Sequence, residues 1–424
     1  MAKILMVLML CLGVCISSLG IAAETIRIGV LLPFSGPMAL LGQEVFDGAS
    51  IVTDMINEKG GIWGKKIEWV KADGVDPKKA ITEAERLIFV EKVKIIFGSY
   101  SSSISYAASD VAERNKIIYW EEGAVADAIT ERGYKYLFRL CLRAGDMGIM
   151  TVNFARDVVA PKLGLNPEKM KIAIMGEDSI YGTTISESAN KEAKRLGMNV
   201  VAKESFSLKA IDLSPIVMIF KARNPDVIIT TNYIEDGILF WRQAKDLDLN
   251  VKAFLGNGGC HSLPVWTKTF GQEANYVFTT EPGTGINPKV FSDKTKAFMN
   301  EFQKRFTKKF NREPATHAMM GGDGALILFE KVLPRAGSLD PEAVRKAALE
   351  LNMPEGETMF GNGVKFAPPG HPNAGQNLRA RPVICQWQEE KMKVVYPVNF
   401  AIREPLLPMP TWEERAKGIT RFVK

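Results

Sequence analysis

The sequence has few of the residues that build metal centres or disulfide frameworks. Its 424 residues include three histidines and five cysteines, and two of the cysteines, Cys11 and Cys15, lie near the start. The other three, Cys141, Cys260 and Cys385, are far apart and show no Cys-x-x-Cys or Cys/His metal spacing. We therefore expect neither a metal site nor a cofactor. A chain of this length builds its own core, so a disulfide framework is not needed either.

The sequence also lacks a concentration of charge of one sign. Lysine and arginine number 54 and aspartate and glutamate 48, which leaves a net charge of +6 with both signs mixed along the chain. Nucleic-acid binding needs a concentrated basic face, so we expect no nucleic-acid partner. With 46% hydrophobic residues, the composition is typical of a folded protein, and the length predicts two domains or one bilobed unit.

Long apolar runs are missing after the first 24 residues, so we expect the mature chain to be soluble. Before that point, Lys3 is followed by an apolar stretch over 4–16 and then by small residues up to Ala23. This order is typical of an export signal cleaved after Ala23, and it predicts a periplasmic location. An uncleaved membrane anchor is the alternative, because 20 uncharged residues just span a bilayer. Bulky Val14 disfavours a lipid anchor on Cys15.

Short β-rich runs alternate with amphipathic helical stretches from residue 25 onward. The run TIRIGVLL reads as a buried strand, and Val45, Ala49, Val52 and Ile56 then form one apolar stripe of a helix. This alternation predicts an α/β fold with parallel sheets and helices on both faces. The expected strands are 25–32, 66–72, 93–97, 116–120, 136–140, 171–175, 199–203, 226–230, 251–255, 276–279, 381–387 and 393–396.

The strand and helix pattern around 66–103 recurs around 199–235, which predicts two similar lobes. Helical stretches then occupy 290–351, and one carries small residues such as Ala318 and Gly322 on a face suited to close packing. A proline-rich tail ends the chain.

In parallel sheets, ligands bind beyond the carboxyl ends of the strands. The loop GSYSSS at 98–103 offers hydroxyls and backbone N–H groups to a small anion, although an ordinary helix cap explains the serines equally well. Glu121 and Glu122 follow the next strand and are either solvated loop acids or ligand contacts. Tyr181 and Tyr233 follow strands of the second lobe and would cover a ligand from the opposite side.

Motifs of catalysis and nucleotide binding are also missing. The turn GNGG at 256–259 lacks the rest of a dinucleotide fingerprint, and the chain has no G-x-x-x-x-G-K-[ST] or G-x-S-x-G motif. No histidine has a plausible partner acid and nucleophile. We therefore expect a protein that is not an enzyme, with a secreted α/β enzyme as the weakest alternative.

Five segments together resemble the type I periplasmic binding proteins, in particular the Leu/Ile/Val-binding branch of ABC-transporter receptors. They are SGPMALLG, INEKGGIWGKKIEWVKADGVDPKKA, FGSYSSSISYAASDVAERNKII, EDSIYGTTISES and TTNYIEDGILFWRQAKDLDLNVKAFLG, and the similarity runs from about residue 25 to about 396. The resemblance implies two Rossmann-like lobes with three hinge crossings, near Ala144, 281–285 and 360–366. The lobes would close around a solute.

The implied division is a signal peptide at 1–23, lobe 1 at 24–143 and 282–362, lobe 2 at 144–281 and 363–400, and a C-terminal extension at 401–424. The implied function is that of an extracytoplasmic solute receptor of an ABC importer. Its partners would be a small-molecule solute and ABC permease subunits at the inner membrane, and we expect a monomer. A ligand sensor or regulator on the same fold is the alternative.

The resemblance also implies a ligand site, taken residue by residue. In amino-acid-binding members a serine holds the substrate carboxylate, and Ser102 matches it here. Val125 stands where a threonine hydroxyl is expected, and Gly258 stands where an acidic residue would bind the α-amino group. The disulfide positions of that branch correspond to Val75 and Ser101, so that bridge is absent. The resemblance and the reading of the loops together predict the ligand-binding residues Leu41, Ser102, Ser103, Glu121, Glu122, Gly123, Ala124, Val125, Tyr181, Tyr233 and Asn257.

These departures argue against an ordinary α-amino acid, because a buried ammonium without a carboxylate is costly. One interpretation is a carboxylic acid without an α-amine, held by Ser102 and backbone N–H groups against the apolar Val125 and Leu41. The other keeps an amine or amide whose acceptor is one of the acids at 121–122. We favour the first.

Overall fold

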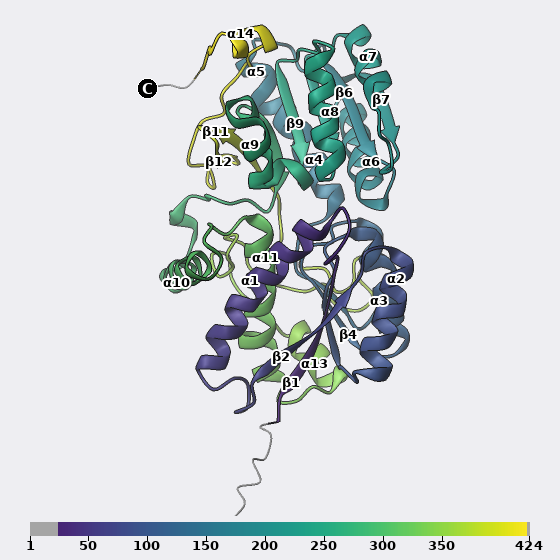
Figure 1. Ribbon diagram of the computed structural model, residues 1–424, viewed down its shortest axis with the longest axis vertical. Helices are drawn as coiled ribbons and strands as arrows, with labels where there is room; N and C mark the ends of the chain where they lie inside the picture. The colour runs from purple at the N-terminus through teal and green to yellow at the C-terminus, as the bar shows by residue number, and fades with distance from the viewer. Residues whose placement is uncertain (1–23, 422–424) are drawn as a thin grey trace, which may run out of the picture.

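The computed structural model describes residues 24–421, which form two α/β lobes stacked end to end (Figure 1). The expected signal segment, 1–23, lies outside the described residues. Lobe 1 is the lower lobe in Figure 1 and lobe 2 the upper one. Within 24–421, no helix combines the length and the apolar character that a membrane crossing requires.

Lobe 1 is built on a five-stranded parallel sheet of order β2-β1-β3-β4-β5. Its inner strands are short, buried and mostly apolar or aromatic, because helices cover both faces of the sheet. The strands are β1 (Ile26–Leu32), β2 (Ile67–Asp73), β3 (Ile95–Gly98), β4 (Ile118–Glu121) and β5 (Leu137–Arg139). The helices are α1 (Ala39–Glu58), α2 (Pro77–Glu85), α3 (Ser102–Arg114), α10 (Asp293–Phe310), α11 (Thr316–Leu326), α12 (Leu333–Ala336) and α13 (Pro341–Leu349).

Lobe 2 carries a seven-stranded sheet of order β12-β11-β10-β9-β8-β6-β7, in which only the β10–β11 and β11–β12 pairs are antiparallel. The strands are β6 (Lys171–Glu177), β7 (Asn199–Phe206), β8 (Val227–Thr231), β9 (Ala253–Asn257), β10 (Phe278–Glu281), β11 (Val383–Gln388) and β12 (Lys391–Tyr396). The helices are α4 (Ala144–Phe154), α5 (Ala160–Lys162), α6 (Ile180–Arg195), α7 (Ser214–Arg223), α8 (Ile234–Asp246), α9 (Pro264–Phe270) and α14 (Trp412–Ala416).

Every strand expected from the sequence is present, and the expected α/β fold with parallel sheets is confirmed. Several strands run further at their carboxyl ends than the apolar pattern indicates, because they end in polar residues that still pair in the sheet. These residues are Asp73, Glu121, Glu177, Asn257 and Glu281. All five lie at the strand ends where a ligand is expected to bind.

The chain passes between the lobes three times, and the third passage comes later than expected. The first follows β5 and the second begins at Pro282. After residue 362 the chain stays on lobe 1, where the ring of Phe366 packs 5.1 Å from that of Phe138. Gln376 continues this contact by accepting a 2.5 Å hydrogen bond from Arg139 Nε.

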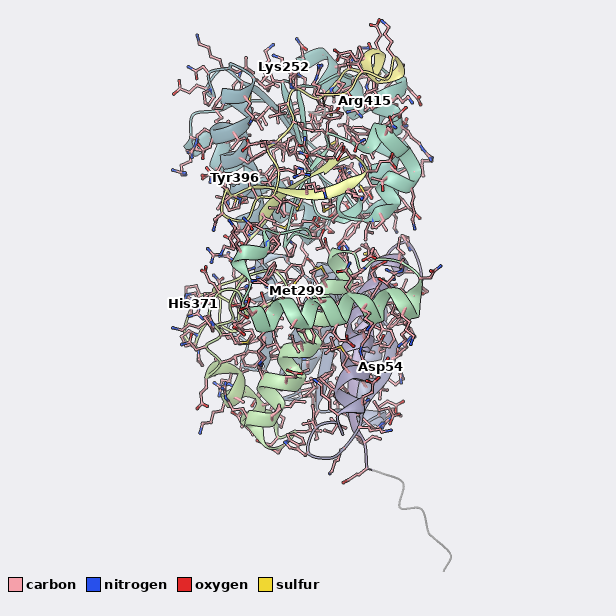
Figure 2. The ribbon with its side chains drawn as sticks, turned by 90° about the vertical axis from the view of Figure 1, so that its left-hand side faces the viewer. Asp54, Lys252, Met299, His371, Tyr396 and Arg415 are labelled. Atoms are coloured by element: carbon pink, nitrogen blue, oxygen red, sulfur yellow. The ribbon has the colours of Figure 1, made fainter. Side chains whose placement is uncertain are left out.

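Figure 2 shows His371 beside the lower lobe, in agreement with these contacts. Residues 363–380 therefore belong to lobe 1, and the chain enters lobe 2 at 380–382, just before β11. The boundary expected at 360–366 is corrected, because this loop has no periodic pattern and is held on lobe 1 by polar side chains.

The C-terminal segment, as far as residue 421, packs on lobe 2. The Trp412 indole donates to the Leu249 carbonyl at 2.9 Å, and its ring lies 5.0 Å from that of Trp241. Arg415 of the same helix lies at the far end of the upper lobe in Figure 2. The tail therefore completes lobe 2 and lies away from the crevice.

Helices α1 and α11 of lobe 1 pack at very close range, as the small residues of α11 predict. A Cβ atom added at Gly321 would overlap the Val45 carbonyl, and one added at Gly48 would overlap the Ala318 carbonyl. The helix backbones therefore touch directly, and neither helix can move aside without loosening the core.

Gly321→Ala should lower the free energy of unfolding by about 1–3 kcal/mol, because the methyl group forces the two backbones apart. Urea unfolding followed by tryptophan fluorescence measures this loss. Asp54→Ala, on α1, removes only an exposed ion pair with Lys309 of α10 and should change the value by less than about 0.5 kcal/mol. Equal unfolding free energies for Gly321→Ala and the wild-type protein would contradict the close packing.

Candidate functional site

A cavity lies between the lobes, at the carboxyl ends of both sheets. We call it the interlobe cavity. Both lobes and the crossing segments contribute to its wall, so a ligand inside it would touch all three. Its lining residues are Tyr100, Ser102, Gly123, Val125, Thr316, His317 and Met320 of lobe 1, Met147, Tyr181, Tyr233, Gly258, Gly259 and Ser262 of lobe 2, and Leu142, Glu281 and Pro282 at the crossings.

The lobe 1 wall presents a serine hydroxyl and a tyrosine–histidine pair. Ser102 lies at the first turn of α3, and its Oγ accepts the Ala126 N–H at 3.1 Å, which leaves the hydroxyl hydrogen for a ligand. Tyr100 Oη and His317 Nε2 are 2.9 Å apart. Burial lowers the pKa of His317 to about 3, so this histidine is neutral and brings no positive charge.

Glu121, at the end of β4, holds the two loops of this wall in place. One carboxylate oxygen accepts the N–H groups of Gly123 at 2.8 Å and Ala124 at 2.7 Å. The other accepts the Ser99 N–H at 2.7 Å and the Ser105 hydroxyl at 2.5 Å. The carboxylate is fully buried and its hydrogen-bonding capacity is used. Glu121 is therefore a structural residue, and the N–H groups of Gly123 and Ala124 are not available to a ligand.

Arg139 of β5 lies opposite Glu121 in the sheet register and is also fully buried. Its Nη1 donates to the Ala126 carbonyl at 2.5 Å and its Nη2 to Thr130 Oγ1 at 3.1 Å. Together with the bond to Gln376, these contacts tie the loop after β4 to the segment that precedes the third crossing. The lobe 1 wall is thus a rigid, hydrogen-bonded unit.

The lobe 2 wall is aromatic. The rings of Tyr181 and Tyr233 lie 5.1 Å apart, and burial raises the pKa of both hydroxyls. The Tyr181 hydroxyl donates to the Asn257 carbonyl. Directly after Asn257 the backbone turns at Gly258, where φ is 58°. Met147 of this wall and Val125 of the lobe 1 wall add apolar surface, so the cavity suits a solute with an apolar body.

Glu281 is the one acidic side chain among the described lining residues, which include no lysine or arginine. It is 1% exposed, and neither carboxyl oxygen has a hydrogen-bond partner. Burial raises its pKa to about 8, so the free protein holds this carboxyl group protonated near neutral pH.

A second cavity adjoins the first where the crossings meet lobe 1, and we call it the hinge cavity. It shares Leu142, Pro282 and Met320 with the interlobe cavity. Glu122 lines it, with both oxygens unpaired and with a pKa raised by burial and by the nearby Glu121. Asp323 also lines it, and burial raises its pKa to about 7.

The structure brings together five of the residues proposed from the sequence: Ser102, Gly123, Val125, Tyr181 and Tyr233. The other six do not line the interlobe cavity. Leu41 lies in the lobe 1 core, and Ser103 is half-buried one position after Ser102 on α3. Glu121 and Ala124 lie within the lobe 1 wall, and Glu122 lines the hinge cavity. Asn257 lies behind Tyr181, whose hydroxyl donates to its carbonyl.

Sequence reasoning missed Tyr100, Glu281 and His317. Tyr100 belongs to the serine-rich loop already singled out, and Glu281 directly follows an expected strand, so both carried a positional signal. His317 carried no such positional signal, because it lies in a helix that packs on lobe 1 after the second crossing.

Comparisons with known proteins find relatives over most of the chain. A family model described as periplasmic binding protein matches residues 25–380. The Leu/Ile/Val-binding protein homolog 7 of Brucella suis biovar 1 is 36% identical over 390 residues, which cover 91% of this chain and 95% of that protein.

Solved structures share the fold at lower identity. The substrate-binding protein LivJ of Streptococcus pneumoniae, in complex with isoleucine, has a TM-score of 0.74 at 21% identity and covers 88% of this chain and 100% of its own. A solute-binding protein of an ABC transporter from R. palustris, in complex with benzoate, has a TM-score of 0.73 at 18% identity and covers 90% of this chain and 98% of its own.

Glu121→Gln should lower the free energy of unfolding by about 3 kcal/mol or more, because an amide has one acceptor oxygen and its NH₂ group would face N–H donors. Chemical unfolding measures the loss. Glu113→Gln is the matched control, since Glu113 also accepts two backbone N–H groups but is only half-buried. A loss no larger than that of the control would show that Glu121 does not hold the loops.

Proposed function

This chain belongs to the periplasmic binding proteins, of the branched-chain amino acid ABC transporter type, and on that basis we propose that it captures a small polar or carboxylate solute in the interlobe cavity by hinge closure. The observation that carries the proposal is a cavity between the lobes whose wall combines apolar side chains with hydroxyl, imidazole and carboxyl groups from both lobes and the crossings. The related structures bind isoleucine in one case and benzoate in another, so the family admits different solutes.

Hinge closure follows from where the contacts lie. Ser102 and His317 are on lobe 1, and Tyr181 and Tyr233 are on lobe 2, so one solute touches all of them only when the lobes are together. A solute that binds the closed arrangement more tightly shifts the population toward it. The hydroxyl of Ser102 would donate to an acceptor atom of the solute.

The receptor would act in the periplasm, exported by its N-terminal signal, as a monomer. Its partners would be the ABC permease subunits at the inner membrane, which distinguish the closed receptor from the open one. The relatives that it matches are solute-binding proteins, which supports a binding role rather than catalysis. A sensor that reports the same solute to a different partner is the alternative, and it would use the same cavity and hinge.

Binding should make the protein more compact. A thermal-shift panel of amino acids, amides, aliphatic acids and aromatic acids identifies the solute, because a ligand at 100 times its Kd adds about 2.7 kcal/mol of apparent stability. Small-angle scattering with the strongest hit should then give a smaller radius of gyration than the free protein. Panel members without a thermal shift serve as controls, and an unchanged radius at saturation would contradict hinge closure.

Ser102→Ala should weaken binding of that solute by about 1–3 kcal/mol, since it removes a buried hydroxyl donor. Isothermal titration calorimetry measures the affinity. Ser50→Ala, on α1, removes a hydroxyl that bonds only to the Asp47 carbonyl and should leave the affinity unchanged. Equal affinities for the Ser102→Ala variant and the wild-type protein would show that this hydroxyl does not touch the solute.

A further inference from the structure

The interlobe cavity contains a carboxyl group that no contact within the protein explains. Glu281 ends β10 where the chain leaves lobe 2 for the second crossing, and it is among the residues that line the cavity. The hydroxyls of Ser262 and Thr316 and the thiol of Cys385 are its polar neighbours. None of them satisfies either oxygen with a hydrogen bond of ordinary geometry. Buried carboxyl oxygens normally have partners, so a missing donor points to a ligand.

The remaining groups of the cavity suit a hydrogen-bond donor on the solute better than an anion. The backbone N–H groups of Gly123 and Ala124, which would hold a carboxylate, already bond to Glu121. The described lining residues include no lysine or arginine, and His317 is neutral because burial lowers its pKa. Arg381 lines only the hinge cavity and pairs with Glu355. A solute carboxylate therefore meets no positive charge here, whereas an amine meets an unpaired acid and three tyrosine rings.

The position of Glu281 also explains why the loop after β9 has no acid. Thr280 of β10 pairs in register with Asn257 of β9, and the Gly258 N–H donates to the Thr280 carbonyl at 3.0 Å. Gly258 and Glu281 thus stand at the same level on adjacent strands. A side chain at 258 is disfavoured, because φ is 58° and a Cβ atom would lie 3.0 Å from the Tyr181 hydroxyl. The carboxyl group is supplied from the neighbouring strand instead.

We propose that Glu281 is the specificity-determining residue of the solute site, where it accepts a hydrogen bond from an amino or amide nitrogen, so that the solute is an amine or amide and not a simple carboxylic acid. This inference rests on the proposed receptor function. The solute then carries a nitrogen, as in the second interpretation of the sequence, but the acceptor of its hydrogen bond is Glu281 and not Glu121 or Glu122. An amino acid satisfies this, because its amino group can donate to Glu281 while its carboxylate accepts a hydrogen bond from the Ser102 hydroxyl.

The test uses matched probes on two scaffolds and the full-length mature protein. The aliphatic set is leucine, leucinamide, isopentylamine and 4-methylpentanoate, and the aromatic set is benzylamine, benzamide and benzoate. Calorimetry should detect binding of nitrogen-bearing members of at least one set and much weaker binding of its simple acid. Glu281→Gln should weaken binding of an amine by about 10- to 100-fold, because a charge-assisted hydrogen bond is lost.

Asp323→Asn is the matched control. It neutralises another buried acid, on α11, whose pKa is also raised by burial but which lines only the hinge cavity. Its affinities should equal those of the wild-type protein. Unfolding midpoints of both variants verify the fold, and Glu281→Gln should not lower the midpoint at pH 8, since it removes a buried ionisable group.

Proton release gives a second readout that a purely structural residue would not change. At pH 7 Glu281 is protonated in the free protein, and a bound ammonium favours the carboxylate, so amine binding should release close to one proton. The titratable groups that face it, Tyr100, Cys385 and His317, are neutral at this pH because burial raises the first two pKa values and lowers the third. Calorimetry in buffers of different ionisation enthalpy counts the protons, and Glu281→Gln should abolish the release.

The outcomes separate this inference from the receptor function. Simple acids that bind as tightly as their amines, or unchanged amine affinity in Glu281→Gln, would overturn the role of Glu281 and leave the receptor standing. A wild-type protein that binds no member of either set would count against the receptor proposal itself.

Discussion

Two oppositely charged residues buried side by side determine the shape of the lobe 1 wall of the interlobe cavity. Glu121 of β4 and Arg139 of β5 are partners in the sheet register, and both are fully enclosed. Removing each from water costs several kcal/mol, and this cost is offset only if their hydrogen-bonding groups are satisfied. The partners that satisfy them are loop groups of 99–105, 123–126 and 376. The loops that face the interlobe cavity are therefore positioned by charges that do not line it.

Glu281 shows the opposite use of the same residue type at the same kind of place. Like Glu121, it ends a buried strand of a parallel sheet, but no protein group satisfies its oxygens. The partnered carboxylate builds a wall, and the unpartnered one remains available to a bound molecule. It lies at a crossing between the lobes, so under the proposed hinge closure a solute that bonds to it would favour the closed arrangement. Its burial lowers the stability of the free protein, and a matching donor on the solute would recover that cost.

Much of the fold was predictable because it follows from local pattern. The apolar runs predict the buried strands, and the helical stripe at Val45, Ala49, Val52 and Ile56 lies in α1, where all four side chains are buried. Because short β-rich runs alternate with helical stretches along the chain, few arrangements other than parallel sheets covered by helices are possible. Prediction failed at 363–380, because that loop is held on lobe 1 by Arg139 and by the Phe138 ring rather than by any pattern of its own.

The sequence by itself determined two α/β lobes, polar residues at the strand ends, and the serine and tyrosines that line the cavity. Only the tertiary structure decided which unpaired carboxyl group belongs to the interlobe cavity. Glu121, Glu122 and Glu281 all follow apolar runs and look alike in sequence, yet the first is saturated by loop donors, the second faces the hinge cavity and the third faces the interlobe cavity. The reason is physical. Whether a buried carboxyl group is paired depends on the number of hydrogen-bond donors that the fold brings to it from distant segments, and a local sequence pattern does not encode that number.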